Sequence, residues 1–295
     1  MLSEGLDQRV WPAGLRPVRG VAAAPDDAAT VSVVELPVFA SDDPAAGEHF
    51  QRNGWALVSA TAAGELEQLR GWVDEIASWP DADGPWLHYR EQTDFGPRLC
   101  RSENFVPFHE GMRTLLCERL AAVAAVLLSG PAVLYKEKIN YKLVGGAGYS
   151  PHQDAPAYPF LHEHVSAMVA VDDATIDNGC LEVVNGAHHD LLQTDERGCI
   201  AADVVATLEW MLVPMRAGEA LFFHSRTPHR SGANNSSYDR RALFPTYNAA
   251  AEGDLRAAYY AAKLAEIADR PITDGRVTVS LIGDFEGRPV SPGTG

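Results

Sequence analysis

The chain has 295 residues, of which 46% are hydrophobic and 22% are charged, so it is long and apolar enough to bury a substantial core. Its 40 acidic and 24 basic residues give a formal net charge of -16, which argues against nucleic acid or an anionic membrane as the main partner, because both attract an excess of Lys and Arg. An anionic ligand would therefore need a local basic pocket.

The cysteines and the apolar runs bear on where the protein works. The four cysteines lie far apart and form no C-x-x-C pair, which predicts neither a zinc ribbon nor a disulfide framework. The N-terminus lacks a positively charged start followed by an apolar core, and the longest apolar run, residues 120–128, is too short to span a bilayer. We therefore expect a soluble, cytoplasmic protein with reduced cysteines.

Three segments are predicted along the chain. Residues 1–30 contain several prolines and no sustained periodicity, so we expect a flexible N-terminal arm. Residues 31–275 carry the periodic patterns and are counted as one domain. Residues 276–295, which are rich in Gly and Pro, form a C-terminal tail.

The domain begins with alternating strands and helices. A first strand is expected at 31–38, and Asp43-Pro44 then opens a helix that ends near Gly54. A short strand at 55–58 precedes a helix at 63–79, where apolar residues recur at helical spacing.

The next segment, residues 80–107, is rich in turn-forming residues. A long irregular segment in a compact domain often covers an active site, although a packed surface loop fits the same composition. A strongly apolar helix is then expected at 113–128. In the remaining chain, short strands separated by turns are expected at 133–143, 165–171, 180–184, 211–215, 220–224 and 242–248. A final helix is expected at 254–269.

The order of these elements predicts the fold class. Helices cluster early, whereas strands separated by turns fill the middle and the end of the chain. We therefore expect a mainly β domain with flanking α-helices, built as a double-stranded β-helix (a cupin-like jelly roll) that the N-terminal helices support.

The stretch Tyr149-Ser-Pro-His-Gln-Asp-Ala-Pro156 has the features of a metal-binding segment. In an extended chain alternate side chains share a face, so His152 and Asp154 can point at one ion while Gln153 points away. A second histidine would complete the 2-His-1-carboxylate triad of non-haem Fe(II) oxygenases. A lone His-x-Asp pair is more often structural than functional, so the prediction depends on that histidine.

Several histidines compete for the third position. His229 follows a predicted strand, lies close to Ser231 in sequence and precedes Arg240 by eleven residues. A 2-oxo acid that chelates iron needs a fixed positive group for its distal carboxylate, and the planar fork of arginine supplies one. The alternating pair at 162 and 164 is a rival that would form a different site, whereas the pair at 188 and 189 follows a turn and is interpreted as surface.

Four stretches occur together in this order: Ile139-Asn-Tyr-Lys142, His152-Gln-Asp154, Asn178-Gly-Cys-Leu-Glu-Val-Val-Asn-Gly-Ala-His188, and Pro228-His-Arg-Ser-Gly-Ala-Asn-Asn-Ser236 with Arg240. Together they resemble the phytanoyl-CoA dioxygenase family, and the chain is similar to its members ectoine hydroxylase and aminoethylphosphonate hydroxylase. The resemblance covers roughly residues 45–265. It implies an Fe(II)- and 2-oxoglutarate-dependent dioxygenase on a double-stranded β-helix.

The resemblance also implies roles for single residues. The positions that match the iron ligands are His152, Asp154 and His229. The positions that match contacts to 2-oxoglutarate are Arg240, which would bind the distal carboxylate, with Ser231, Asn140 and Lys136. Lys136 departs from the pattern, because ectoine hydroxylase carries a glutamine there.

The implied reaction uses Fe(II), 2-oxoglutarate and O2, with ascorbate as a reductant in vitro. It hydroxylates an unactivated C-H bond and releases succinate and CO2. A related halogenase would replace the carboxylate ligand with a small residue, and Asp154 argues against that. Desaturation and cyclisation use the same triad and stay open, while a non-catalytic metal-binding β roll would not need Arg240.

The substrate prediction starts from the polar face of strand 133–143, which carries Lys136, Lys138, Asn140 and Lys142. A solvated strand face fits these residues as well as a wall of the cleft does. If the face lines the cleft, Lys138 favours a small anionic substrate, such as an amino acid or a phosphonate. The alternative is a larger natural product beneath segment 80–107, with Trp86, Tyr89 and Tyr158 as its walls.

Overall fold

The computed structural model describes residues 36–62, 64–81, 86–93, 96–158, 161–269, 277–278 and 286–289. By its internal contacts the chain divides into two units, residues 1–35 and 36–295, and all described residues belong to the second. The predicted arm at 1–30 lies outside the described residues, and so does most of the predicted tail at 276–295.

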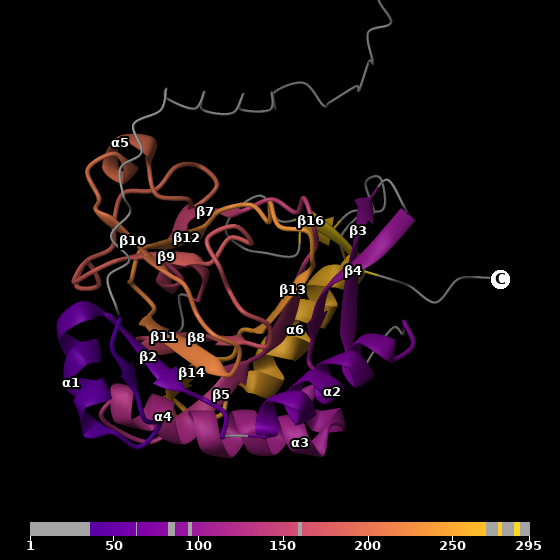
Figure 1. Ribbon diagram of the computed structural model, residues 1–295, viewed down its shortest axis with the longest axis horizontal. Coiled ribbons are helices and arrows are strands. Elements are labelled where there is room, and N and C mark those ends of the chain that lie inside the picture. Colours follow the sequence, from indigo (N-terminus) through magenta and orange to yellow (C-terminus); the bar gives the residue numbers. More distant parts are fainter. Residues whose placement is uncertain are drawn as a thin grey trace, which may run out of the picture. The chain divides into compact units, whose positions relative to one another are not determined.

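Four helices near the start of this unit lie together on one side of the larger sheet (Figure 1). Helix α1 begins where the Asp43 side chain accepts a hydrogen bond from the amide of Ala45, and it ends at Gly54, whose φ of 79° suits glycine. Their apolar faces join the core of the sheet through residues such as Val73 and Leu120. These four helices are α1 (Pro44–Asn53), α2 (Glu65–Ser78), α3 (Glu110–Arg113) and α4 (Leu120–Leu127), and the π-helical turn Thr114–Arg119 connects α3 to α4. Two further helices, α5 (Ala202–Val205) and α6 (Arg256–Asp269), come later in the chain.

The strands form one large sheet and one sheet of four strands. The large sheet contains β1 (Val38–Phe39), β2 (Trp55–Ser59), β3 (Leu87–Thr93), β4 (Gly96–Glu103), β5 (Ala132–Lys136), β6 (Lys138–Lys142), β8 (His164–Ala170), β11 (Glu219–His224), β13 (Arg240–Leu243), β14 (Thr246–Ala249), β15 (Val277–Thr278) and β16 (Glu286–Pro289). The second sheet has the order β10 (Trp210–Val213), β9 (Leu181–Val184), β12 (His229–Ser231) and β7 (Tyr149–His152).

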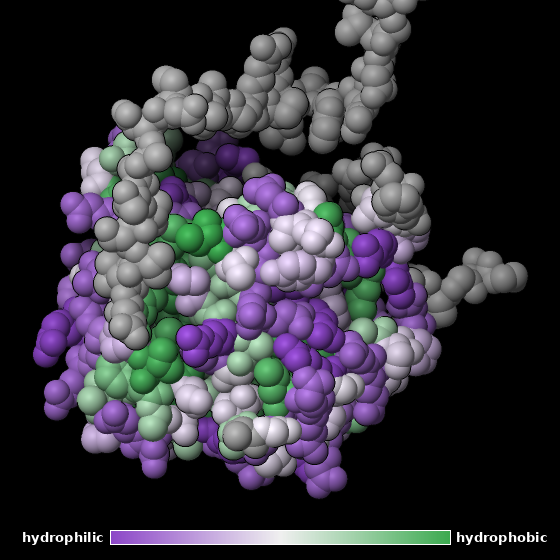
Figure 2. All heavy atoms as spheres, viewed as in Figure 1, coloured by the Kyte–Doolittle hydropathy of each residue, from purple (hydrophilic) through white to green (hydrophobic). Residues whose placement is uncertain are grey.

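The two sheets pack face to face. Their shared core contains Leu57 and Phe223 from the large sheet and Leu181, Val183 and Val213 from the small one. This arrangement is a jelly roll of two sheets whose strands are antiparallel apart from the pair β1 and β2, so the predicted fold class is confirmed. On the face shown in Figure 2, hydrophilic residues cover most of the described surface and the hydrophobic ones form small separate patches.

Segment 80–107 was expected to be irregular, and this was wrong for most of the residues that the structure describes there. Strands β3 and β4 form an antiparallel hairpin in it, in which Leu87 pairs with Glu103, and β4 pairs in turn with β6. Tyr89 and Cys100 are buried in a small core of their own beneath the hairpin. The segment therefore extends the large sheet, in which β3 also pairs with β16, and Arg101 and Glu103 of the hairpin are buried.

Two predicted strands are each broken once. Strand 133–143 divides at Glu137 and strand 242–248 divides at Phe244-Pro245, where proline has no amide hydrogen to donate. The backbones of Lys138 and Phe244 exchange hydrogen bonds at the break. The Glu137 side chain is buried and accepts hydrogen bonds from the Arg256 guanidinium on α6, so the helix holds the break in place.

Two further findings concern the cysteines and the length of the helices. None of the four cysteines, Cys100, Cys117, Cys180 and Cys199, forms a disulfide bond. Among the helices that the structure describes, none combines the length and the apolar character that crossing a membrane requires.

Candidate active site

A cavity of about 290 Å³ opens between the two sheets, and side chains of both sheets line it. The polar face of β5 and β6 forms one wall, with Lys136, Lys138, Asn140 and Lys142 all in contact with the cavity. Three of these are buried and Lys138 is half-buried, so this face does not point to bulk water. Of the two interpretations of the lysine-rich strand, the structure supports the cleft wall.

One end of the cavity brings His152, Asp154 and His229 together. His152 ends β7 and His229 begins β12, and the two residues are paired across these strands. Asp154 follows two residues after the strand end, so that its Oδ1 lies 3.8 Å from Nε2 of His152 and 3.9 Å from Nε2 of His229. Among the described residues this is the one group of three such side chains whose donor atoms all lie within 4.8 Å of one another.

Hydrogen bonds from Nδ1 orient both histidine rings so that Nε2 of each faces Asp154. Nδ1 of His152 lies 2.7 Å from the carbonyl oxygen of Ser150, and Nδ1 of His229 lies 3.0 Å from that of Thr227. A carbonyl only accepts, so each Nδ1 donates a hydrogen, and each Nε2 is the ring nitrogen that is left to face a metal ion at the centre of the group. Burial, together with the neighbouring His229, lowers the pKa of His152 to about 3, which keeps its imidazole neutral.

A hydrogen bond also orients the carboxylate of Asp154. Ser166 donates a hydrogen bond of 2.6 Å to Oδ2 of Asp154, which leaves Oδ1 facing the histidines. Burial opposes ionisation of Asp154, but His229, His152 and Lys136 outweigh it and hold the pKa of this carboxyl well below its usual range. Two imidazoles and an ionised carboxylate fit a divalent iron ion by the chemistry of their donor atoms.

The rival histidines lie elsewhere. His164 is buried beside the ring of Tyr158, with both ring nitrogens unpartnered among the described residues, and it is not part of the group. His162 is exposed. The surface interpretation of the pair at 188 and 189 was wrong for His188, which is buried against Gly54, and right for His189, which is exposed.

Arg240 and Arg241 point in opposite directions from β13, as consecutive residues of a strand do. Arg240 is buried and lines the cavity, whereas Arg241 pairs with Asp172 and Asp74 outside it. Arg240 donates only to the sulfur of Met168 at 3.7 Å and to the carbonyl of Gly179 at 3.4 Å, and its Nε has no partner among the described residues. Such a guanidinium has capacity left for an anionic ligand.

Two predicted co-substrate contacts, Ser231 and Asn140, also face the cavity. The Oδ1 atom of Asn140 accepts a hydrogen bond of 3.0 Å from Nε of Arg101, a buried residue of β4. The amide nitrogen of Asn140 is therefore the donor that remains for a ligand. Arg101 belongs to the hairpin that the sequence did not predict, so its orienting contact was not foreseen.

Two of the three lysines of the wall, Lys136 and Lys138, have different surroundings. Lys136 is hydrogen-bonded to the Tyr158 hydroxyl, and burial lowers its pKa to about 8 against the opposing charge of Asp154. Lys138 places its ammonium 5.4 Å from the centre of the Phe244 ring, and burial, with the charges of Arg101 and Lys136, holds its pKa well below the usual value.

The aromatic walls proposed for a larger substrate do not line this cavity. Tyr158 lies behind Lys136 and packs against Tyr135 and Tyr259. Tyr89 is fully buried under the hairpin, and Trp86 packs against Trp79 and Phe108. These positions remove the main support for that alternative.

Comparisons with known proteins agree on a family. The model of the phytanoyl-CoA dioxygenase (PhyH) family matches residues 50–242. The chain is 48% identical over 228 residues to methylphosphonate hydroxylase of Gimesia maris, an alignment that covers 76% of this chain and 88% of that protein. It is 38% identical over 200 residues to 2-aminoethylphosphonate dioxygenase of an uncultured bacterium, covering 66% and 76%.

Solved structures share the fold at lower identity. EctD of S. alaskensis with 2-oxoglutarate and 5-hydroxyectoine has a TM-score of 0.62 and 21% identity, covering 72% of this chain and 78% of EctD. The epimerase SnoN in complex with Fe3+, alpha-ketoglutarate and nogalamycin RO has a TM-score of 0.60 and 23% identity, covering 85% and 97%.

Proposed function

The chain belongs to the phytanoyl-CoA dioxygenase family of iron- and 2-oxoglutarate-dependent dioxygenases, and from this premise we propose that it hydroxylates an unactivated C-H bond of a small organophosphonate, with release of succinate and CO2. The family supplies the cofactors: iron, 2-oxoglutarate and O2. The substrate class is the part that this chain's own residues must support.

The observation that carries the proposal is the pair of ammonium groups, Lys136 and Lys138, on the cavity wall. In a protein with a net charge of -16, they form a local basic pocket next to the residues that suit iron. Lys136 is buried and Lys138 is half-buried. An anion would interact with such partly desolvated ammonium groups more strongly than with lysines on the surface. The names of the two relatives above each refer to a phosphonate, which agrees with such a pocket.

Each residue then has a proposed role. His152, Asp154 and His229 hold Fe(II), which, with 2-oxoglutarate and O2, supplies the oxidising power that no side chain has. Arg240, Ser231 and the Asn140 amide receive 2-oxoglutarate. Lys138 receives the anionic group of the substrate, with Lys136 beside it, and the two packed sheets limit the access of water.

The experiment is a succinate-release assay with purified protein, Fe(II), ascorbate and 2-oxoglutarate. Methylphosphonate and 2-aminoethylphosphonate are compared with acetate and 3-aminopropionate, which have the same carbon substituents on a carboxylate. We expect a phosphonate to raise succinate release above the substrate-free rate and to gain one oxygen atom by mass spectrometry. Stimulation by the carboxylates alone, or by neither class, would contradict the proposal.

A further inference from the structure

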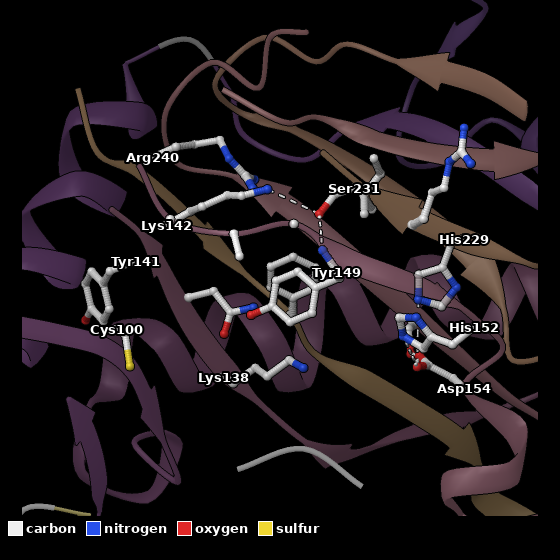
Figure 3. Close-up of a pocket in the computed structure, with 18 of the residues that line it drawn as sticks. Cys100, Lys138, Tyr141, Lys142, Tyr149, His152, Asp154, His229, Ser231 and Arg240 are labelled. Atoms are coloured by element: carbon white, nitrogen blue, oxygen red, sulfur yellow. Dashed lines mark hydrogen bonds and ion pairs between the residues drawn. The ribbon is translucent and has the colours of Figure 1, made fainter. Parts of the chain in front are cut away.

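A second positive charge lies next to Arg240 in the cavity. Lys142 and Arg240 are paired residues of β6 and β13, and both point into the cavity, so their side chains are direct neighbours on one face of the sheet. Figure 3 shows the two side chains ending together beside Ser231. Like charges at directly opposite positions of two strands destabilise a sheet unless something compensates them.

No carboxylate compensates this pair within the described part of the chain. Arg240 and Lys142 are 5% and 7% exposed, and neither forms an ion pair there, whereas the adjacent Arg241 has two acidic partners. Both cations instead donate to the same carbonyl, that of Gly179. Burial and the charge of Arg240 lower the pKa of Lys142 to about 7, so the charge pair is unfavourable without an anion.

The hydroxyl of Ser231 indicates where that anion would sit. Its oxygen accepts hydrogen bonds from Nζ of Lys142 at 3.2 Å and from the amide of Tyr149 at 3.3 Å. A hydroxyl oxygen accepts two hydrogen bonds and donates one, so the hydrogen of Ser231 is left to donate, and no described residue accepts it. The hydrogen bond from Lys142 therefore leaves the Ser231 hydroxyl to act as a donor. Arg240, which lines the same cavity, also has an unused donor, its Nε.

We propose that Lys142 is a positioning residue of the subsite for the distal carboxylate of 2-oxoglutarate, where it orients the Ser231 hydroxyl and adds a second positive charge beside Arg240. The inference rests on the proposed role of Arg240. The ammonium of Lys142 also donates to the carbonyls of Gly179 and Gly232, so a purely structural role is the competing explanation.

Binding measurements separate the two explanations, with Mn(II) in place of iron so that no turnover occurs. Wild type and Lys142→Gln are titrated by calorimetry with 2-oxoglutarate and with 2-oxovalerate, which has a methyl group in place of the distal carboxylate. Glutamine still offers hydrogens to the carbonyls but has no charge. We expect 2-oxoglutarate to bind at least about tenfold more weakly to the variant, and 2-oxovalerate to change by less than about twofold.

Equal weakening of both ligands, or no weakening of either, would overturn the proposal. Lys142→Arg, which keeps the charge, should retain most of the affinity for 2-oxoglutarate, and a loss as large as that of the glutamine variant also counts against it. Arg240→Gln is measured in parallel. If Arg240→Gln also weakens both ligands equally or weakens neither, the carboxylate subsite lies elsewhere. If Arg240→Gln weakens 2-oxoglutarate selectively and Lys142→Gln does not, only the role of Lys142 is rejected.

Discussion

Ser166 donates its hydroxyl hydrogen to Oδ2 of Asp154, and this contact decides which carboxylate oxygen faces the two histidines. Ser166 lies on β8 of the large sheet, while His152 and His229 belong to the small sheet. The metal-binding geometry therefore depends on how the two sheets are packed, since the carboxylate is held from one sheet and the imidazoles come from the other.

Replacement of Ser166 by alanine should weaken Fe(II) binding by about tenfold without abolishing it, because partners that orient a metal ligand usually contribute 10 to 100-fold in affinity. Asp154→Ala should abolish both tight binding and turnover. Equilibrium dialysis with Fe(II) under anaerobic conditions measures the affinity. His162→Ala is the control, since this exposed histidine should have no effect. An unchanged affinity in Ser166→Ala would show that Asp154 does not need its hydrogen-bond partner.

The two neighbouring arginines should behave differently when each is replaced by alanine. Arg240→Ala should raise the KM for 2-oxoglutarate steeply, because the distal carboxylate would lose its buried cation. Arg241→Ala should leave this KM nearly unchanged and lower the free energy of unfolding by about 1 to 3 kcal/mol, because it loses its hydrogen bonds to Asp172. Steady-state kinetics and urea denaturation measure the two effects, and exchanged phenotypes would contradict the assignment.

This pair also illustrates what the sequence could predict. Strand residues alternate between faces with a period of two, so the separation of Arg240 from Arg241 follows from local pattern alone. The same is true of the lysine-rich face, although its break at Glu137 depends on Arg256, which is far away in the sequence. The metal-binding motif was recognisable because two of its members are close in sequence.

Other features of the site needed the three-dimensional structure. Lys142 and Ser166 gain their importance from strand pairings between distant segments, and no local pattern reports such a register. The hairpin of β3 and β4 was read as irregular because turn-forming residues flank it, and its pairing with β6 is also non-local. His188 follows a turn, as predicted, but is buried because Gly54 of another segment packs on its ring.

Acid should destabilise the metal-free protein through its buried neutral histidines. Burial lowers the pKa of both His164 and His224 to about 4, below the usual value of 6.5, so the unfolded chain binds more protons between these values. The free energy of unfolding should therefore fall as the pH decreases from about 6.5 to about 4, by on the order of 3 kcal/mol for His164. Urea denaturation at several pH values measures this dependence.

A matched variant isolates the contribution of His164. His164→Asn removes one of the titrating groups and should make the pH dependence less steep in the same range, whereas His162→Asn, on the exposed neighbour, should leave it unchanged. Asp154 does not contribute to this pH dependence. Because its pKa is lowered in the folded protein, the stability that its carboxylate provides is lost only below the usual aspartate pKa, which lies below the pH range measured. A slope that both variants share with the wild type would assign the acid sensitivity to other groups.

Replacement of Lys138 should affect the substrate far more than the co-substrate. Its half-buried ammonium lies on the cavity wall near Phe244, on the same face as Asn140, so an anionic substrate group bound there would lose a charge-assisted contact in Lys138→Ala. We expect the KM for a phosphonate substrate to rise by about tenfold or more, and the KM for 2-oxoglutarate to change by less than about threefold. Lys138→Arg, which keeps the charge, should recover part of the loss. A substrate KM that is the same in Lys138→Ala and in the wild type would mean that the anion is bound elsewhere, with Lys136 as the next candidate.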